Sequence, residues 1–163
     1  MMELHYLPLD EADPSELIAL LNQPRVRTHL VEHVAFDRAS IARWVAAKMD
    51  VDNTPGCRVR AVMVKGRLAG WCGIQPDEGG YEIGIVLADE FWGAGKPIFI
   101  DMMAWAREFG HEEVRIHLLE TRREYRFLQR LASRVDGSML MGRNFRTYHL
   151  PVANETSMVD EAL

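Results

Sequence analysis

Cysteine is scarce in this sequence, and so is any apolar run long enough to cross a bilayer. The two cysteines, Cys57 and Cys72, lie in or beside strand-like segments. Two cysteines do not make a disulfide framework, so we interpret them as small buried apolar residues in a reducing cytoplasm. The opening MMELHYLPLDEADP lacks the basic start and apolar run of a signal peptide. These absences predict a cytoplasmic protein that does not associate with membranes.

An excess of positive charge is also missing, because the formal net charge is -5 at pH 7. This balance argues against a protein that covers nucleic acid with its whole surface, although it leaves room for a local basic patch. With 163 residues and 48% hydrophobic content, the chain can bury one sizeable core and has no room for a second domain. We expect a single domain over residues 1–150 and a loose polar tail over 151–163.

Hydrophobic periodicity predicts a mixed α/β order along the chain. Strand-like alternation marks residues 4–9, 58–65, 68–74, 81–87 and 113–119, with a last strand or strand pair within 138–150. Helical patterns mark residues 15–21, 36–48, 98–109 and 121–135. The predicted fold class is therefore α/β in the broad sense that includes α+β, with the helices and strands interspersed.

The most informative stretch is GYEIGIVLADEFWGAGKPI, residues 80–98. An alternating strand runs through an acidic turn into a glycine-rich helix start. Gly93 and Gly95 let a ligand approach the backbone closely, and Pro97 fixes φ for a first helical position. The amides exposed at such a helix start suit a phosphate or pyrophosphate. The competing interpretation is a tight turn before a helix, with no ligand.

This stretch resembles the acyl-CoA-binding core of the GNAT N-acetyltransferase superfamily, where a strand reading roughly xEIGxxL precedes a WxGxGxG-like loop. Residues 82–85 match the strand, and residues 92–95 match the first part of the loop. The chain departs from the family at the two ends of the loop, where it has Trp92 and Pro97. The predicted element order also matches, so the resemblance covers almost the whole chain. It implies the GNAT fold, a central mixed and mostly antiparallel sheet flanked by helices, in a divergent member.

The resemblance implies an acyl-CoA-dependent N-acyltransferase that uses acetyl-CoA as co-substrate. It further implies direct transfer to the amine of a small-molecule or macromolecular acceptor, without a covalent enzyme intermediate. The cofactor-binding residues carried over from it are Ile85, Val86 and Leu87 on the strand, Trp92, Gly93, Ala94, Gly95 and Lys96 in the loop, and Arg122 beyond it. We expect no metal, since no metal-ligand cluster and no nucleophile triad competes with this interpretation.

Glu82 is the candidate general base, because the family often uses a strand carboxylate at this place. Desolvation at the mouth of an apolar cleft would raise its pKa toward the working pH, whereas a solvated strand glutamate would have no such role. His117 on the following strand and His111 at its start are further titratable candidates. Each histidine is also readable as a structural residue.

Tyr125 is the candidate general acid for the leaving thiolate. The family places a tyrosine where this chain has Leu128, and Tyr125 lies one helical turn earlier on the same face of the predicted helix. It either substitutes for that tyrosine, or it packs with Leu128, Leu131 and Val135 as a core stripe while the thiolate leaves unassisted.

Arginine recurs at four-residue spacing in the same predicted helix, at Arg122, Arg126, Arg130 and Arg134. One interpretation is a solvated helix face, and a second is a contact with the 3′-phosphate of CoA. A third is that the row, together with Arg143 and Arg146, binds a polyanionic substrate such as nucleic acid or a phosphorylated acceptor, although the acidity of the whole chain weakens this interpretation.

Two rival functions remain open at this stage. The departures from the family at Trp92, Pro97, Thr121 and Leu128 favour a catalytically degenerate GNAT-fold protein that binds acyl-CoA or a partner, such as a phage-related protein. The other rival is an interaction component that kept only the fold.

Methionine and aromatic residues near the end of the chain predict a homodimer, because GNAT domains often pair through their C-terminal strands. These residues are Met139, Met141, Phe145 and Tyr148.

Overall fold

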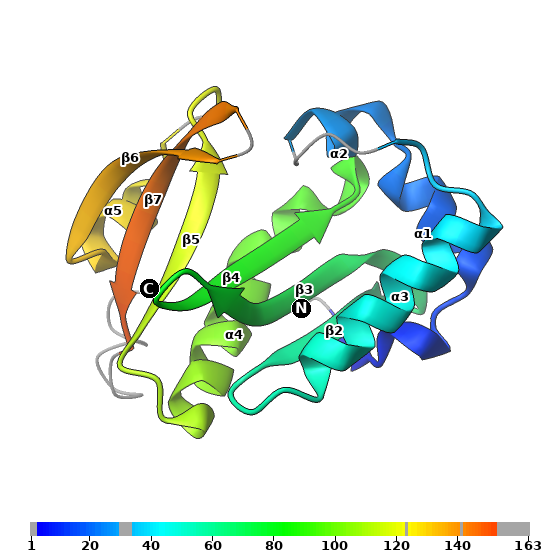
Figure 1. The fold of residues 1–163 in the computed structure, drawn as a ribbon, viewed down its shortest axis with the longest axis horizontal. Coiled ribbons are helices and arrows are strands. Elements are labelled where there is room, and N and C mark those ends of the chain that lie inside the picture. The colour runs from blue at the N-terminus through cyan, green and yellow to red at the C-terminus, as the bar shows by residue number, and fades with distance from the viewer. Residues whose placement is uncertain (1–2, 30–33, 123, 141, 153–163) are drawn as a thin grey trace.

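A computed structural model of the protein describes residues 3–29, 34–122, 124–140 and 142–152 (Figure 1). The strands are β1 (Leu4–Leu7), β2 (Arg58–Val64), β3 (Arg67–Asp77), β4 (Gly80–Leu87), β5 (Glu113–Leu119), β6 (Arg134–Leu140) and β7 (Arg143–Pro151). The helices are α1 (Pro14–Leu21), α2 (Pro24–His29), α3 (Arg38–Asp52), α4 (Gly95–Phe109) and α5 (Arg126–Leu131), with 3₁₀ helices η1 (Leu9–Glu11) and η2 (Asp89–Ala94). None of these helices is long and apolar enough to cross a membrane.

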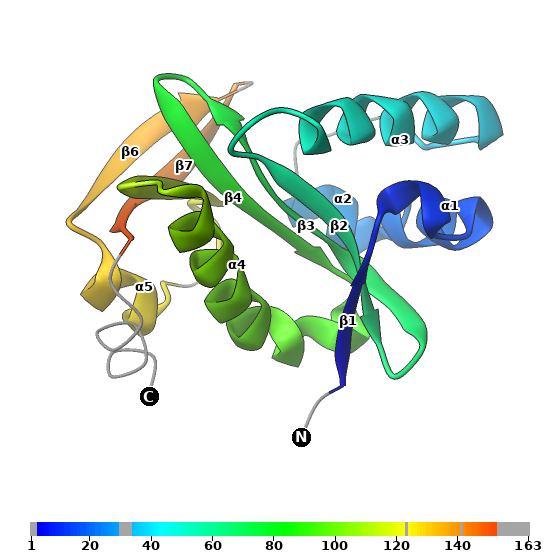
Figure 2. The same cartoon turned by 90° about the horizontal axis from the view of Figure 1, so that it is seen from below.

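The strands form one sheet in the order β1-β2-β3-β4-β5-β7-β6. Every neighbouring pair is antiparallel except β4 and β5, which are parallel and are linked by a crossover through α4. Helices α1, α2 and α3 lie over one face of the sheet, and α4 and α5 over the other (Figure 2). The prediction of a mixed, mostly antiparallel sheet flanked by helices is confirmed.

Each face of the sheet carries its own hydrophobic core. On one face, α4 buries Ile98, Phe99 and Met102 against strand residues such as Ile83 and Tyr148. The other core joins α1 and α3 to β2, β3 and β4 and includes Leu17, Leu21, Ile41, Val59 and Trp71. Burial of each large apolar side chain contributes on the order of 1.5–3 kcal/mol, so both layers hold the sheet in place. Both cysteines are free and buried, as predicted.

The predicted helix over residues 121–135 is mostly wrong. Only Arg126–Leu131 is helical, and Ala132 is already extended, with ψ at 138°. The amide of Ser133 donates to the carbonyl of His149 at 2.8 Å, and the following residues pair with β7 as β6. Pairing with an available sheet edge has overridden local helix propensity here. Consequently the arginine row is not a helix face, and Val135 is 43% exposed on β6 rather than part of a core stripe.

Other predicted boundaries shift by a few residues. Helix α4 begins at Gly95, which makes Pro97 its third residue rather than its first. Strand β3 continues to Asp77, which shortens the predicted turn at residues 75–80. The predicted hairpin between β2 and β3 forms around Lys65 and Gly66, which both have positive φ. Of the predicted tail, residues 153–163 lie outside the described residues.

Candidate functional site

A large cavity opens where β4 and β5 separate. The two strands share one registered pair, Glu82 opposite Arg115, and diverge beyond it. The resulting space has a volume of about 1210 Å³. Its apolar walls are formed by Ile85, Val86 and Leu87 of β4 and by Ile116 and Leu118 of β5. A cavity of this size accepts a ligand larger than an ordinary drug-sized molecule.

Cationic side chains gather around the same cavity. Those that line it are Arg25, Lys96, Arg122, Arg126 and Arg130. The guanidinium of Arg122 lies 5.8 Å from the ring centroid of Trp92 and donates to the Tyr125 hydroxyl at 2.9 Å. The amine of Lys96 lies 5.4 Å from the ring of Phe127. This cationic rim beside an apolar cleft suits a ligand with an anionic end and an apolar arm.

The start of α4 presents bare backbone to the cavity. Gly93 and Gly95 both line it, and no side chain caps the helix. A Cβ atom built on Gly93 would meet nothing within 4 Å, and one on Gly95 would meet only the Leu87 Cδ1 atom at 3.9 Å. Gly95 has φ of -58°, so the missing side chain matters here rather than an unusual backbone conformation. The arrangement fits a pyrophosphate held at a helix N-terminus. Ala94, by contrast, is fully buried and is not among the residues that line the cavity.

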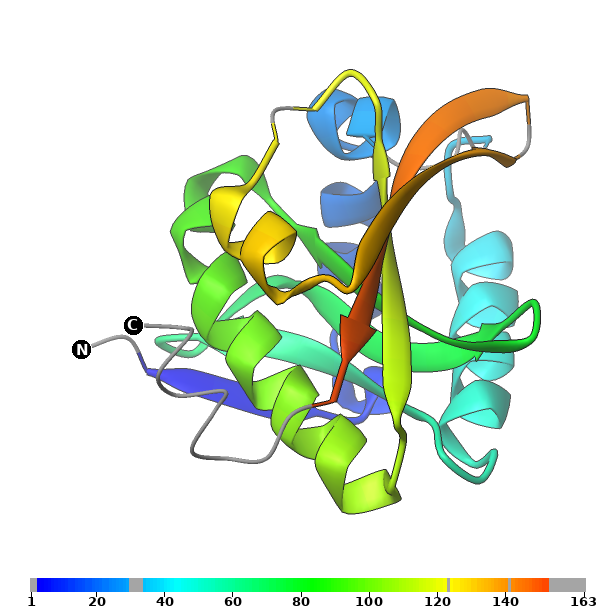
Figure 3. The same ribbon diagram turned by 90° about the vertical axis from the view of Figure 1, so that its left-hand side faces the viewer.

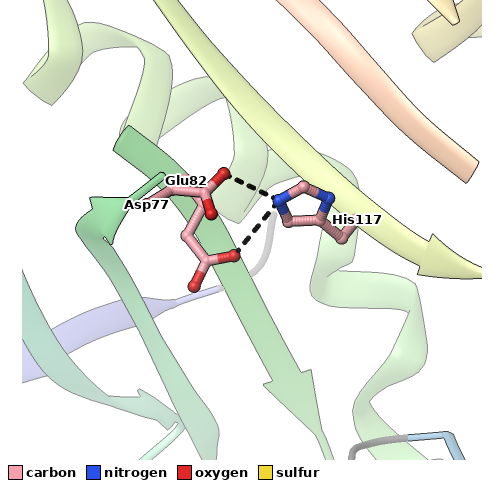
Figure 4. Close-up of side chains that lie close together, drawn as sticks. All are labelled: Asp77, Glu82 and His117. Carbon is pink, nitrogen blue, oxygen red and sulfur yellow. Dashed lines mark hydrogen bonds and ion pairs between the residues drawn. The ribbon is translucent and has the colours of Figure 1, made fainter. Parts of the chain in front are cut away.

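Asp77, Glu82 and His117 meet at the closed end of the split, from β3, β4 and β5 (Figure 4). The Nε2 atom of His117 lies 2.8 Å from the Asp77 Oδ2 atom and 3.6 Å from the Glu82 Oε2 atom. Its Nδ1 atom lies 2.7 Å from the hydroxyl of Thr147. The structure thus brings the predicted Glu82 and His117 together and adds Asp77, which sequence reasoning missed because it treated residues 75–80 as a turn.

The pKa values of the two carboxylates in this cluster are shifted in opposite directions. Burial raises the pKa of Glu82 and Asp77 raises it further, while His117 and Lys48 oppose the rise. Burial also acts to raise the pKa of Asp77. The hydrogen bond and charge of His117, the Glu78 amide and Arg115 outweigh it and leave that pKa below its usual value. Paired groups with pKa values pushed apart can divide the work, with Glu82 suited to accept a proton and Asp77 to stay ionised.

The same cluster has a spacing that would suit a metal ion, since its three ligand atoms lie within 4.8 Å of one another. Arg115 already provides a positive charge to this cluster, since its guanidinium lies 3.3 Å from the Asp77 carboxylate. That pairing argues against an additional cation, and we interpret the group as an acid–base cluster.

The remaining candidates lie in different places. Tyr125 lines the cavity at the start of α5, with its hydroxyl turned to Arg122, rather than one turn before Leu128 on a long helix. His111 lies against the ring of Tyr81 at 4.1 Å, and its Nε2 atom is 2.8 Å from the carbonyl of Gly56. Because a carbonyl only accepts, that nitrogen carries the proton, and His111 has a structural role.

A sheet split between β4 and β5, with a glycine-bearing helix start and a carboxylate at the apex of the split, is the architecture of an acetyltransferase of the GNAT type. Residues 3–126 match the family model described as "Acetyltransferase (GNAT) domain". The chain therefore belongs to this family, and the resemblance noted in its sequence is confirmed. The match ends just inside α5, before the segment whose structure the sequence predicted poorly. No curated protein matches the chain.

Solved structures show the same fold. The microcin C7 self-immunity acetyltransferase MccE, whose structure is a complex with acetyl-CoA and AMP, gives a TM-score of 0.71 at 16% identity over 92% of both chains. A GCN5-related N-acetyltransferase from Brucella melitensis gives 0.68 at 18% identity, over 98% of this chain and 79% of the other. A GNAT-family acetyltransferase from Streptococcus pneumoniae gives 0.64 at 13% identity, over 92% and 97%. At these identities the similarity establishes the fold alone.

Proposed function

We propose that the protein is a cytoplasmic N-acetyltransferase that uses acetyl-CoA as co-substrate and transfers the acetyl group directly to an amine. The observation that carries this proposal is the cavity between β4 and β5, which has apolar walls and a cationic rim, together with Glu82, a carboxylate of raised pKa at the closed end of the same split. The fold similarity to MccE, which binds acetyl-CoA, supports the choice of co-substrate.

The cavity residues divide into three roles under this proposal. Ile85, Val86 and Leu87 line the part that would hold the pantetheine arm. The backbone at Gly93 and Gly95 would bind the pyrophosphate, and Lys96 with the arginines of the rim would pair with the phosphates. Trp92 contributes a ring beside Arg122 in place of the residue that the family usually has there.

Glu82 would then act on the acceptor amine. It takes the proton that the amine loses as the new N–C bond forms and the C–S bond of the thioester breaks. The hydrogen bond between His117 and Asp77 fixes the position of both side chains beside Glu82. The departing thiolate takes a proton from Tyr125, which lines the cavity, or from solvent. No covalent enzyme intermediate is needed.

The acceptor is an amine on a small molecule or a macromolecule. Its entry side is the sheet face that carries Glu82, where α3 packs over β3. Carboxylates dominate the cluster at this point, so a polyanionic acceptor such as nucleic acid is disfavoured.

Acetyl-CoA consumption against a panel of amines tests the proposal. Release of free CoA thiol should exceed the hydrolysis rate without acceptor for at least one class of amine, and acetylated product should accumulate in equal amount. Binding of CoA without turnover on any amine would contradict the enzyme and favour the degenerate, acyl-CoA-binding alternative.

We also propose a homodimer through β6. This strand is one of the two edge strands of the described sheet, the other being β1, and it faces the viewer in Figure 3. It carries Val135, Met139 and Leu140 at 43%, 70% and 36% exposure. An exposed apolar edge is ordinarily covered, and a second copy is one such cover. Phe145 and Tyr148 are buried in the core instead, and Met141 lies outside the described residues.

Light scattering at micromolar concentration should therefore report about twice the 18.6 kDa mass of the chain. Met139→Glu should shift the particle toward the monomer, because it places a charge on that edge. A parent chain that stays monomeric throughout would reject the dimer.

A further inference from the structure

Lys48 of α3 places a primary amine beside the candidate base. Its Nζ atom donates to the Oε1 atom of Gln75. Gln75 is the direct cross-strand partner of Glu82, so both side chains rise from the same face with their Cβ atoms about 5 Å apart. The amine therefore occupies the acceptor side of the sheet, next to the carboxylate assigned to remove a proton.

The residues around Lys48 also pack on the stretch of β4 that leads to the cavity. Its Nζ atom lies 4.6 Å from the ring centroid of Trp71 and 5.8 Å from that of Trp44. The ring of Trp71 and the Nε2 atom of Gln75 both come within 3.6 Å of the point where Gly84 would carry a Cβ. Gly84 stands between Glu82 and the cavity residue Ile85 on β4. The amine is thus held above the short stretch of strand that joins the base to the cleft.

We propose that Lys48 is an acetylation site of the protein itself, modified by the acetyl-CoA bound in its own cavity. The neutral Nζ atom attacks the thioester carbonyl carbon, an N–C bond forms, the C–S bond breaks, and CoA leaves as the thiolate. The proton lost by the attacking nitrogen passes to Glu82 and from there to the thiolate or to solvent. This inference rests on the proposed function, because it needs the same co-substrate and the same base.

The electrostatic setting of Lys48 supports its role as a nucleophile. Burial lowers the pKa of its amine, and Glu82 opposes part of that effect. A lowered pKa increases the fraction of neutral amine at neutral pH, and only the neutral form has the lone pair that attacks. Flanking by two tryptophan rings and Gln75 also restricts the side chain to few rotamers, which favours reaction at this site.

The sequence supplies its own controls, since its lysines are Lys48, Lys65 and Lys96. Lys65 is exposed in the turn between β2 and β3. Lys96 is exposed at the cationic rim, with its amine over Phe127. Neither residue is near Glu82 in the contacts described. An enzyme-directed reaction should therefore select Lys48, whereas chemical acetylation would favour the exposed lysines.

Mass spectrometry of the purified full chain, incubated with acetyl-CoA and no other amine, tests the inference. We expect the intact mass to rise by one acetyl group and fragmentation to place it on Lys48. Lys65→Arg should retain the modification, Lys48→Arg should lose it, and Glu82→Gln should slow it by at least about tenfold. Equal labelling of Lys65, or labelling of Lys48 at the same rate in protein unfolded by urea, would overturn the proposal.

Two further measurements separate this inference from the proposed function. CoA binding by calorimetry and turnover with an external amine report on the function alone. A chain that binds CoA and acetylates an external amine without modifying Lys48 overturns the self-acetylation only, whereas a chain that binds no CoA overturns both. If Lys48→Arg instead raises KM for amines that carry a carboxylate, and Lys48 stays unmodified, the residue belongs to acceptor binding and the inference fails.

Discussion

Glu82→Gln is expected to slow acetyl transfer by about 100-fold to 10,000-fold, the usual loss when a general base is removed. Glutamine keeps the shape of the side chain but cannot take the amine proton. Affinity for CoA should stay at the parent value, because Glu82 is not among the residues that line the cavity. Steady-state rates with the best acceptor, together with calorimetry of CoA binding, give the two quantities.

The pH profile separates a base from a structural carboxylate. Burial raises the pKa of Glu82, so the parent rate should fall as the pH drops through that raised pKa and the base becomes protonated. The defect of Glu82→Gln should shrink at alkaline pH, since the amine then loses its proton in solution. Glu78→Gln, in the exposed turn between β3 and β4, is the matched control and should behave as the parent. Normal turnover of the Glu82→Gln enzyme would mean that His117 or solvent, rather than Glu82, removes the proton from the amine.

Gly95→Val is expected to weaken CoA binding by more than about tenfold, or about 1.4 kcal/mol. The new side chain would extend from the first residue of α4 into the cavity, where its Cβ meets only Leu87 at 3.9 Å. The fold should tolerate it, because φ at Gly95 is helical and, beyond the adjoining residues and its own helix, the new Cβ meets only the Leu87 side chain within 4 Å. The loss should therefore come from blocked access of the pyrophosphate to the backbone.

Calorimetry with CoA, on protein whose thermal unfolding is checked in parallel, measures this effect. Gly137→Val serves as the control, since a Cβ there meets nothing within 4 Å and Gly137 lies on β6, outside the lining of the large cavity. Unchanged CoA affinity in a folded Gly95→Val protein would remove the helix start from the binding site.

Tyr125→Phe is expected to leave the rate within a few-fold of the parent. The hydroxyl accepts a hydrogen bond from Arg122 and the ring lines the cavity, so the ring keeps its packing when the hydroxyl is lost. Rates measured with the same acceptor as for Glu82→Gln make the comparison direct. An inactive Tyr125→Phe enzyme beside a normal Glu82→Gln enzyme would reverse the two assignments.

The fold was predictable where local pattern and tertiary contacts agree. Helix α1 begins at Pro14, capped by Asp13, whose side chain accepts from the Ser15 amide at 2.7 Å. Helix α4 ends at Phe109 and is capped by Gly110, which has a positive φ of 79°. The segment after β5 was not predictable in this way, because its arginine and leucine spacing suits a helix while the edge of β7 offers strand pairing. The spacing of residues 121–135 gives no indication that part of this segment pairs with β7.

The site was predictable only along β4 and the loop after it. Glu82, the cavity residues of the strand and the two glycines are contiguous in sequence, so a motif identifies them together. Asp77, Lys48 and Thr147 reach the same place through sheet register and the packing of α3, across separations that no local pattern encodes. Asp77 was missed because β3 continues three residues beyond the predicted end of the strand at Ile74.

The single registered pair between β4 and β5 also bears on how the protein unfolds. One half of the sheet, β1 to β4, and the other half, β5 with β7 and β6, share almost no ladder, and the core that includes α4 packs against both. Because this junction has so little ladder, we expect local opening there at lower free energy than unfolding of the whole molecule. The cavity in the split is lined by residues of both β4 and β5, so a ligand bound there would contact both halves and stabilise their association. At a concentration about 100 times its Kd, it would add about 2.7 kcal/mol to the free energy of unfolding.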